Sequence, residues 1–264
     1  MGSRVEILNH GGYRSDGRRQ YELRNFDIDF SGSNSTADGY CTVTHGLTTV
    51  IAFVFGPREA SQRNLTMHDR AIINVEVNVA PFSSNDRRRR GRGDRRLLEL
   101  AASIKSTFEP VVQIHLYPRS EIDIFIQVME QDGGFLQAAI NATTLALINA
   151  GIPMIDYVAA VTCGVSSTKP LLDLTTLEEN DVPHVTVAVM PKTGKVTLVT
   201  METRLHVDRF DEILNLAISA SKTLHLHMRA AVRGYTTDLV RAMGSTGSTG
   251  KEAAMEDENM DVAI

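Results

Sequence analysis

The run from Gly133 to Ile155 constrains the fold most, because it carries no charged side chain and could cross a bilayer by length alone. Its polar interruptions are Gln137, Asn141, Thr143, Thr144 and Asn149, and Gly151 and Pro153 then break it. These residues favour a helix over about 135–149 that is buried in a soluble core rather than a membrane span. We therefore expect a soluble, intracellular protein.

Composition narrows the class of protein further. The chain has 264 residues, of which 42% are hydrophobic and 22% charged, so a wholly disordered or fibrous protein is excluded. The net charge of -5 excludes a surface that is basic throughout, but it allows a local basic patch. Cys41 and Cys163 are too few for a disulfide framework or a four-thiolate zinc site, and no signal segment is recognisable. Both observations fit a reducing compartment.

Stretches with the two-residue period of strands alternate with stretches of helical period. The predicted strands are 40–55 with a turn at Gly46 and a stop at Gly56-Pro57, 73–79, 112–117 and 122–128 joined around Pro118, 157–165, and 185–189 and 196–198 around a turn at 192–195. The predicted helices are 95–108 capped by Asp94, 135–149, and a long helix from Asp208. This order favours an α+β fold, with helices packed on mixed or antiparallel sheets, over a doubly wound parallel fold. The Gly/Ser/Thr-rich and then acidic segment 244–264 is expected to be a disordered tail.

The most unusual stretch is 86–96, which holds seven arginines and two aspartates. A solvated loop is the ordinary interpretation of such a run. In a chain of net charge -5, however, the run concentrates positive charge at one place. Arg95 and Arg96 also open a predicted helix, where N–H groups and the helix dipole favour anions. The run therefore predicts an RNA or DNA partner held through phosphates, since nearby aromatic residues are few.

Other chemistry is weakly indicated by the residues alone. The eight histidines are scattered, and we find no phosphate-binding loop, dinucleotide glycine pattern or nucleophile elbow in a suitable context. Asp173, Glu178, Glu179 and Asp181 follow an apolar run. Such carboxylates can hold Mg²⁺ or act as a general acid, but their spacing alone favours a solvated loop.

Several motifs together resemble the RNase PH family in order and spacing over about residues 4–235. They are Ser15-Asp16-Gly17-Arg18-Arg19, Gly56-Pro57-Arg58-Glu59, Asp94-Arg95-Arg96, Gln131-Asp132-Gly133-Gly134 before INATTLALINAGIPM, and Leu172-Asp173-Leu174 with Glu178-Glu179. Within the family the chain is similar to the eukaryotic exosome ring subunit related to the catalytic subunit of the archaeal exosome. The resemblance implies an RNase PH-like (ribosomal S5 domain 2-like) βαβα fold over 1–243, with two similar halves of about 1–152 and 153–243.

The resemblance also implies a relict catalytic site. Catalytic members degrade RNA from its 3′ end by phosphorolysis, and they bind phosphate through a Ser/Thr-Arg pair just after the Asp-Gly-Gly-like motif. Phe135-Leu136-Gln137 stands there in this chain, so the hydroxyl and the guanidinium are missing. Asp173 matches the catalytic aspartate, and Glu179 replaces the metal-binding aspartate with a side chain one methylene longer. We therefore expect no enzymatic activity, no cofactor and no bound metal.

Two pairs of residues match RNA-contacting positions of the family. Arg95 and Arg96 match an arginine pair at the central channel, and Arg63 and Asn64 match positions that line the route of threaded RNA in the eukaryotic subunit. The remaining arginines, Arg87 to Arg92, exceed what the family usually carries, so their role stays open.

The resulting hypothesis is a non-catalytic subunit of an RNA exosome, which threads single-stranded RNA through the channel for 3′-to-5′ processing and degradation. The expected partners are other RNase PH-like subunits in a hetero-hexameric ring, S1/KH cap proteins and a hydrolytic exoribonuclease, in the nucleus, nucleolus and cytoplasm. One alternative is an active phosphate-dependent exoribonuclease whose phosphate site comes from another subunit. Another is a purely structural ring component, whose arginines contact acidic protein side chains.

Overall fold

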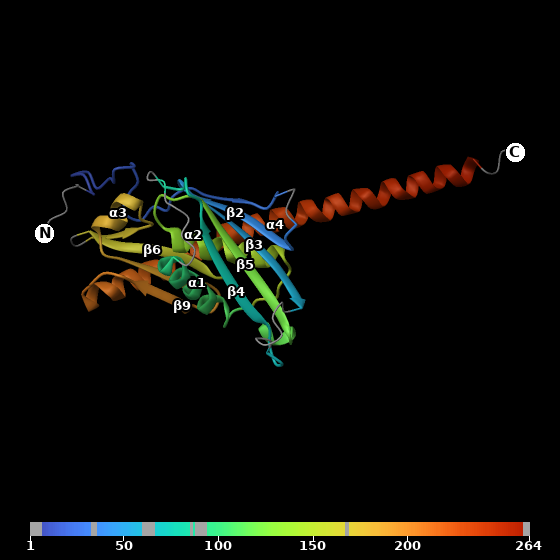
Figure 1. Cartoon of the computed structure of the whole chain (residues 1–264). Helices are drawn as coiled ribbons and strands as arrows, with labels where there is room; N and C mark the ends of the chain where they lie inside the picture. Colours follow the sequence, from blue (N-terminus) through green and yellow to red (C-terminus); the bar gives the residue numbers. More distant parts are fainter. Residues whose placement is uncertain are drawn as a thin grey trace. The chain divides into compact units, whose positions relative to one another are not determined.

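The computed structural model describes residues 7–32, 36–59, 67–84, 87, 94–166 and 169–260, with the side chains of α4 described as far as Met243 (Figure 1). Its elements are β1 (Phe26–Asp29), β2 (Gly39–His45), β3 (Thr48–Glu59), β4 (Ile72–Val79), α1 (Arg95–Phe108), the 3-10 helix η2 (Ile114–Leu116), β5 (Ser120–Glu130), α2 (Phe135–Asn149), β6 (Ala159–Ser166), β7 (Lys169–Leu172), α3 (Thr176–Asp181), β8 (His184–Met190), β9 (Lys195–Met201) and α4 (Val207–Met260). One compact unit ends at His225, and the rest of α4 forms a second unit.

Two sheets form the first unit. The five-stranded sheet has the order β1-β2-β3-β5-β4, in which only the β4–β5 pair is parallel (Figure 1). The four-stranded sheet has the order β7-β6-β8-β9 and is antiparallel throughout. The expected α+β fold with mixed and antiparallel sheets is therefore confirmed.

The uncharged helix α2 packs against strands of both sheets, including β2, β3, β6 and β8. Every residue from Leu136 to Leu147 is buried, which explains why the helix is apolar on all sides. Its polar side chains bind the neighbouring backbone: the Asn141 amide pairs with both the N–H and the C=O of Ala160, at 2.8 and 3.1 Å. In the described part of the chain, no helix combines the length and the apolar character needed to cross a membrane.

Helix α1 begins as the sequence predicts. The Asp94 side chain accepts a hydrogen bond from the backbone N–H of Arg96 at 3.1 Å, which caps the helix. Ala101, Ile104 and Phe108 are buried, and α1 contacts β4 and β9. The cap and the contact with β4 place the arginine pair Arg95-Arg96 near the C-terminal end of that strand.

Some predicted elements are wrong. Residues 112–117 do not form a strand: Val112 makes one isolated bridge to Met154, and η2 follows. Their alternation arises because Val112 and Ile114 are buried in a short connection. The expected pairing of 112–117 with 122–128 around Pro118 is therefore also absent, and β5 pairs with β3 and β4 instead. Strand β3 continues beyond Gly56-Pro57 to Glu59 through a register shift, and β1, β7 and α3 were not predicted.

The last helix extends into the segment from Gly244. In the structure the backbone of α4 continues to Met260, through the segment from Gly244 for which the sequence predicts disorder. Residues 251–260, KEAAMEDENM, are rich in alanine, glutamate and methionine, which favour helix. Residues 261–264 lie outside the described part of the chain.

Candidate functional site

Asp173, the residue that matches the family's catalytic aspartate, lies directly after β7 and is completely buried. Its backbone adopts the left-handed conformation, with φ of 57°. Its backbone N–H donates to the Thr162 carbonyl at 2.8 Å, and its own carbonyl accepts from the guanidinium groups of Arg14 and Arg18 at 3.0 and 3.1 Å. These bonds hold the residue in a conformation that is uncommon for an aspartate.

The Asp173 carboxylate is enclosed by polar side chains. Its Oδ1 atom accepts from Nε and Nη2 of Arg24, at 3.0 and 2.8 Å, and from Nε2 of Gln137 at 2.7 Å. Its Oδ2 atom accepts from the backbone N–H of Arg24 at 2.7 Å and lies 3.0 Å from Nε2 of His45. Both oxygens are therefore engaged by groups inside the protein.

The charge of Asp173 is fixed by the same neighbours. Burial by itself would raise the pKa of the carboxyl group, but the charges and hydrogen bonds of His45 and Arg24 outweigh burial and hold the pKa well below 3.8. The group is therefore ionised at neutral pH.

The two neighbouring glutamates have different positions. Glu178 completes a capping box with Thr175 at the start of α3, and it faces the buried guanidinium of Arg14 at 3.5 Å. Glu179 reaches instead to the start of α2, where its Oε1 atom accepts from the backbone N–H of Gly134 at 2.6 Å. Burial raises the pKa of Glu179, and the Gly134 bond offsets this only in part.

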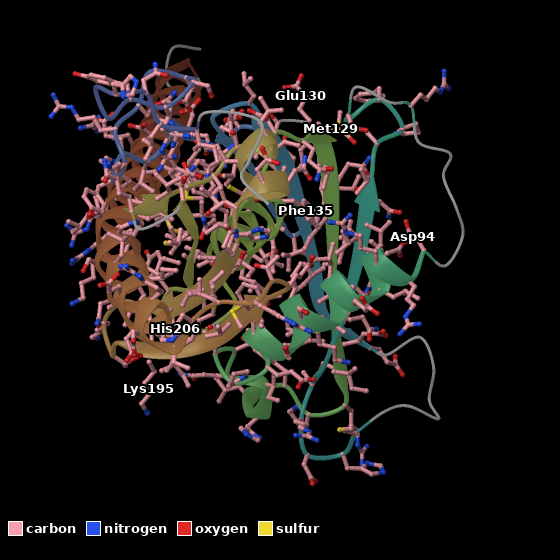
Figure 2. The ribbon with its side chains drawn as sticks, turned by 90° about the vertical axis from the view of Figure 1, so that its left-hand side faces the viewer. Asp94, Met129, Glu130, Phe135, Lys195 and His206 are labelled. Atoms are coloured by element: carbon pink, nitrogen blue, oxygen red, sulfur yellow. The ribbon has the colours of Figure 1, made fainter. Side chains whose placement is uncertain are left out.

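A cleft of about 340 Å³ lies between the start of α1, the start of α2 and strands β8 and β9. Figure 2 labels Asp94 at the start of α1 and Phe135 at the start of α2. These two helix ends border the cleft. The lining of the cleft includes residues that the sequence analysis singled out. They come from separate elements and are Arg96, Glu179 and the apolar pair Phe135-Leu136. Asp173 is not part of the wall, so the cleft and the buried aspartate are separate features.

The cleft is unfavourable for an inorganic phosphate ion. Its charged lining is Asp94, Glu99, Glu179 and Glu202 against Arg96, with His184 beside them. The backbone N–H of Gly134 could otherwise donate to an anion, but it is already bonded to Glu179. The side chains of Phe135 and Leu136 offer no hydrogen bond at the point where the phosphate pair of the family would stand. Among these two residues, only the backbone N–H groups at the start of α2 could donate to an anion, beside four carboxylates of the lining.

The arginine pair at the start of α1 points in two directions. The Arg95 side chain is 92% exposed, and its Nε lies 3.0 Å from Glu99 one helical turn away. Arg96 lines the cleft. Arg63, Asn64 and residues 88–92 lie outside the described residues, and Arg87 is exposed.

Comparison with known proteins identifies the family. The 3′ exoribonuclease family (RNase PH) matches residues 22–153 with its domain 1 and residues 156–220 with its domain 2. This chain belongs to the RNase PH family. The RNase PH domain 1 match covers the five-stranded sheet and α2, and the domain 2 match covers the four-stranded sheet and the first part of α4.

Individual relatives are similar over most of the chain. The exosome complex component ski6 of Schizosaccharomyces pombe is 40% identical over 231 residues, which are 88% of this chain and 95% of the relative. The human exosome complex component RRP41 is 37% identical over 242 residues, with coverage of 91% and 98%. The exosome complex component Rrp41 of Thermococcus kodakarensis is 40% identical over 233 residues, with coverage of 87% and 92%.

Solved structures share the fold. Rice Rrp46 aligns with a TM-score of 0.75 and 22% identity, covering 83% of this chain and all of that one. A chain of the Archaeoglobus fulgidus exosome, solved with RNA bound to the active site, aligns with a TM-score of 0.72 and 23% identity, covering 82% and 93%. The RNase PH-like fold expected from the motifs is therefore confirmed.

Sequence reasoning missed the residues that enclose Asp173. Arg14, Arg18 and Arg24 come from the N-terminal segment, and only Arg18 was part of a motif that we singled out. Gln137 was noted as part of the missing phosphate pair, yet its amide bridges Asp173 and the backbone N–H of Thr162, at 2.7 and 2.5 Å. The signal that could have found these residues is the unusual number of arginines between residues 14 and 24.

The residues present do not fit the Mg²⁺ ion that the family pattern implies. Mg²⁺ requires several oxygen ligands in near-octahedral geometry. Here the oxygens of Asp173 are engaged by Arg24 and Gln137, and Glu179 accepts from Gly134. Within the described ranges, no three His, Cys, Asp or Glu side chains converge in a way that could hold a metal ion.

Proposed function

We propose that this RNase PH family member is a ring subunit of an RNA exosome, which binds single-stranded RNA and guides it through the central channel without catalysing phosphorolysis. The similarity to exosome components over most of the chain supports the assembly. The exposed Arg95 and the cleft-lining Arg96 support the contact with RNA phosphates.

The enclosure of Asp173 is the observation that carries the non-catalytic part of the proposal. A phosphorolytic site needs an acid that reaches the substrate and a pocket that holds phosphate. Arg24, His45 and Gln137 occupy the carboxylate, while the cleft nearby is lined mostly by acidic and apolar side chains. Both observations support a subunit that does not catalyse phosphorolysis.

The proposed assembly includes other RNase PH-like subunits in a hetero-hexameric ring, S1/KH cap proteins, and a separate hydrolytic exoribonuclease that receives the threaded RNA. Such an assembly would serve rRNA processing and mRNA decay in the nucleus, nucleolus and cytoplasm. The mass of the native complex would test its composition directly.

Two assays on the assembled ring test the function. Without the hydrolytic nuclease, we expect no phosphate-dependent release of nucleoside diphosphates, but we expect salt-dependent protection of single-stranded RNA. Phosphate-dependent release that is lost in Glu179→Gln would show that this subunit is an active phosphorolytic enzyme. Absence of RNA protection would instead favour a purely structural ring component.

A further inference from the structure

Arg70 and Arg119 both contact Met67 at one end of the five-stranded sheet. Strands β4 and β5 are parallel and begin at the same end, with Ile72 opposite Glu121 and Ile73 opposite Ile122. Arg70 and Arg119 lie just before the first pair, in the segments that lead into the two strands. The two segments are also bonded directly, because the Arg119 N–H donates to the Met67 carbonyl at 3.2 Å and the Ala71 N–H donates to the Ile114 carbonyl at 3.0 Å.

Both guanidinium groups are exposed and available. The Nε of Arg70 donates only to the Met67 sulfur at 3.1 Å, and neither arginine forms an ion pair with a described carboxylate. Arg58 on the adjacent strand β3 differs, since its guanidinium is bonded to Asp123. Two neighbouring positive charges without an anion repel each other, and an anion placed between them removes that repulsion.

The surroundings suit a nucleic acid. Met67, His68, His115 and Leu116 are exposed beside the two arginines, and we call these six residues the β4–β5 patch. Asp69 is the acidic residue within the described segments 67–70 and 115–119. The nearby Glu121 and Asp123 both accept from the amide of Asn74. Exposed histidine and apolar side chains can contact bases, while the arginine forks match phosphate oxygens.

Arg119 has an unusual backbone as well. Its φ is 61°, in the left-handed region that residues other than glycine, asparagine and aspartate rarely adopt. Such outliers are often found at binding sites. Here the hydrogen bond holds the Arg119 backbone at Met67, whose sulfur accepts from the Nε of Arg70.

We infer that the β4–β5 patch binds phosphate groups of single-stranded RNA, in addition to the contacts expected of Arg95, Arg96, Arg63 and Asn64. The inference rests on the proposed function, which brings RNA to this subunit. Val79, at the C-terminal end of β4, lines the same cleft as Arg96, whereas Arg70 precedes the N-terminal end of β4. Because β4 has eight residues, the two basic places are about 26 Å apart along this edge strand.

The test uses the assembled ring and the salt dependence of RNA binding. Replacing Arg70 and Arg119 with alanine should lower the slope of log affinity against log salt by about 1.4, since each lost phosphate contact removes about 0.7. Arg70→Lys with Arg119→Lys should keep the slope, because the charges remain. Arg229→Ala with Arg233→Ala is the matched control, since it removes two exposed arginines of α4 and should leave the slope unchanged.

The outcomes separate the two claims. A wild-type slope in Arg70→Ala with Arg119→Ala overturns the inference, while a lower slope in Arg95→Ala with Arg96→Ala in the same assay leaves the proposed function standing. An equal loss in the Arg229 and Arg233 control would mean that general charge is responsible, which also overturns the inference. If the wild-type ring binds no RNA, the proposed function fails. In that case, binding of polyglutamate that depends on Arg70 and Arg119 would assign the patch to an acidic protein partner instead.

Discussion

The Arg24 guanidinium lies 2.8 Å from the Asp173 carboxylate, and neither side chain is more than 5% exposed. The two residues are 149 positions apart in the chain, so their ion pair fastens the N-terminal segment to the end of β7. The other contacts of this pair reach the Gly133 carbonyl before α2 and the amide of Gln137 within it. The aspartate at the family's catalytic position therefore connects three parts of the fold.

Asp173→Asn should destabilise the protein. The substitution removes the negative charge that compensates the buried Arg24. The asparagine NH₂ group would also face an N–H donor in either orientation, because both oxygens of Asp173 accept from N–H groups. Breaking a buried ion pair from one side costs about 3–5 kcal/mol in the free energy of unfolding. Urea denaturation would measure the loss. The exposed Asp211→Asn is the matched control and should change stability by less than about 0.5 kcal/mol.

Restoring the missing phosphate pair should not restore phosphorolysis. In Phe135→Thr with Leu136→Arg, a hydroxyl and a guanidinium return to the start of α2. Asp173 stays enclosed, and Glu179 still occupies the Gly134 N–H, so the acid and part of the anion site remain unavailable. We expect nucleoside diphosphate release by the assembled ring to stay at background. Release that rises with phosphate concentration in this variant would show that Asp173 can reach a substrate.

Glu179 should make stability fall as pH rises. Its pKa is raised in the folded protein by burial, so below the unfolded value of about 4.5 both states are protonated and no penalty exists. As pH rises through the folded pKa, Glu179 loses its proton more readily in the unfolded state, so the unfolded state is favoured over the folded state. Glu179→Gln should remove this loss, so its stability relative to wild type should grow from pH 4.5 upward in urea denaturation. A stability difference that stays constant over that range would contradict the expectation.

Asp173 should make stability fall as pH decreases in the acid range. Its folded pKa is held well below 3.8, so its contribution to stability is complete above that value and is lost as pH falls through the folded pKa. Thermal unfolding of wild type should therefore show a steep acid loss below about pH 3.8, and Asp173→Asn should show a smaller one. Equal acid losses in the two proteins would mean that Asp173 is not the responsible group.

Local patterns predicted the elements that have regular periodicity. Elements of the structure correspond to the alternation at 73–79 and 122–128 and to the uncharged helix 135–149. They could be predicted because burial of one face, or of the whole helix, determines the type of each consecutive residue. The alternation at 112–117 led to a wrong strand prediction, because two buried residues in a short connection give the same pattern as a strand.

The environment of Asp173 could not be predicted in this way. Its partners Arg24 and Gln137 are 149 and 36 residues distant, so no local pattern joins them. Sequence motifs identified Arg96, Glu179 and Phe135-Leu136 as site positions, and the cleft brings them together. The motifs did not reveal that Glu179 binds the Gly134 N–H, because that contact depends on how α3 faces the start of α2.

Replacing Arg95 and Arg96 should weaken RNA binding without harming the fold. Arg95 is almost fully exposed, and its ion pair with Glu99 is a surface pair that contributes little to stability. Helix α1 is held by Ala101, Ile104 and Phe108 rather than by the arginines. In the assembled ring, Arg95→Ala with Arg96→Ala should lower the salt slope of RNA binding by about 1.4, with sequence preference unchanged because phosphates carry no base information.

RNA length then distinguishes threading from simple binding. With the hydrolytic nuclease added, the double variant should slow decay of an RNA long enough to pass through the ring, because that RNA depends on contacts along the channel. A very short RNA can reach the nuclease directly, so its decay should be spared. Equal slowing of both substrates would indicate a damaged assembly, which the native mass would reveal. If both substrates decay at the wild-type rate and the salt slope is unchanged, Arg95 and Arg96 do not contact the threaded RNA.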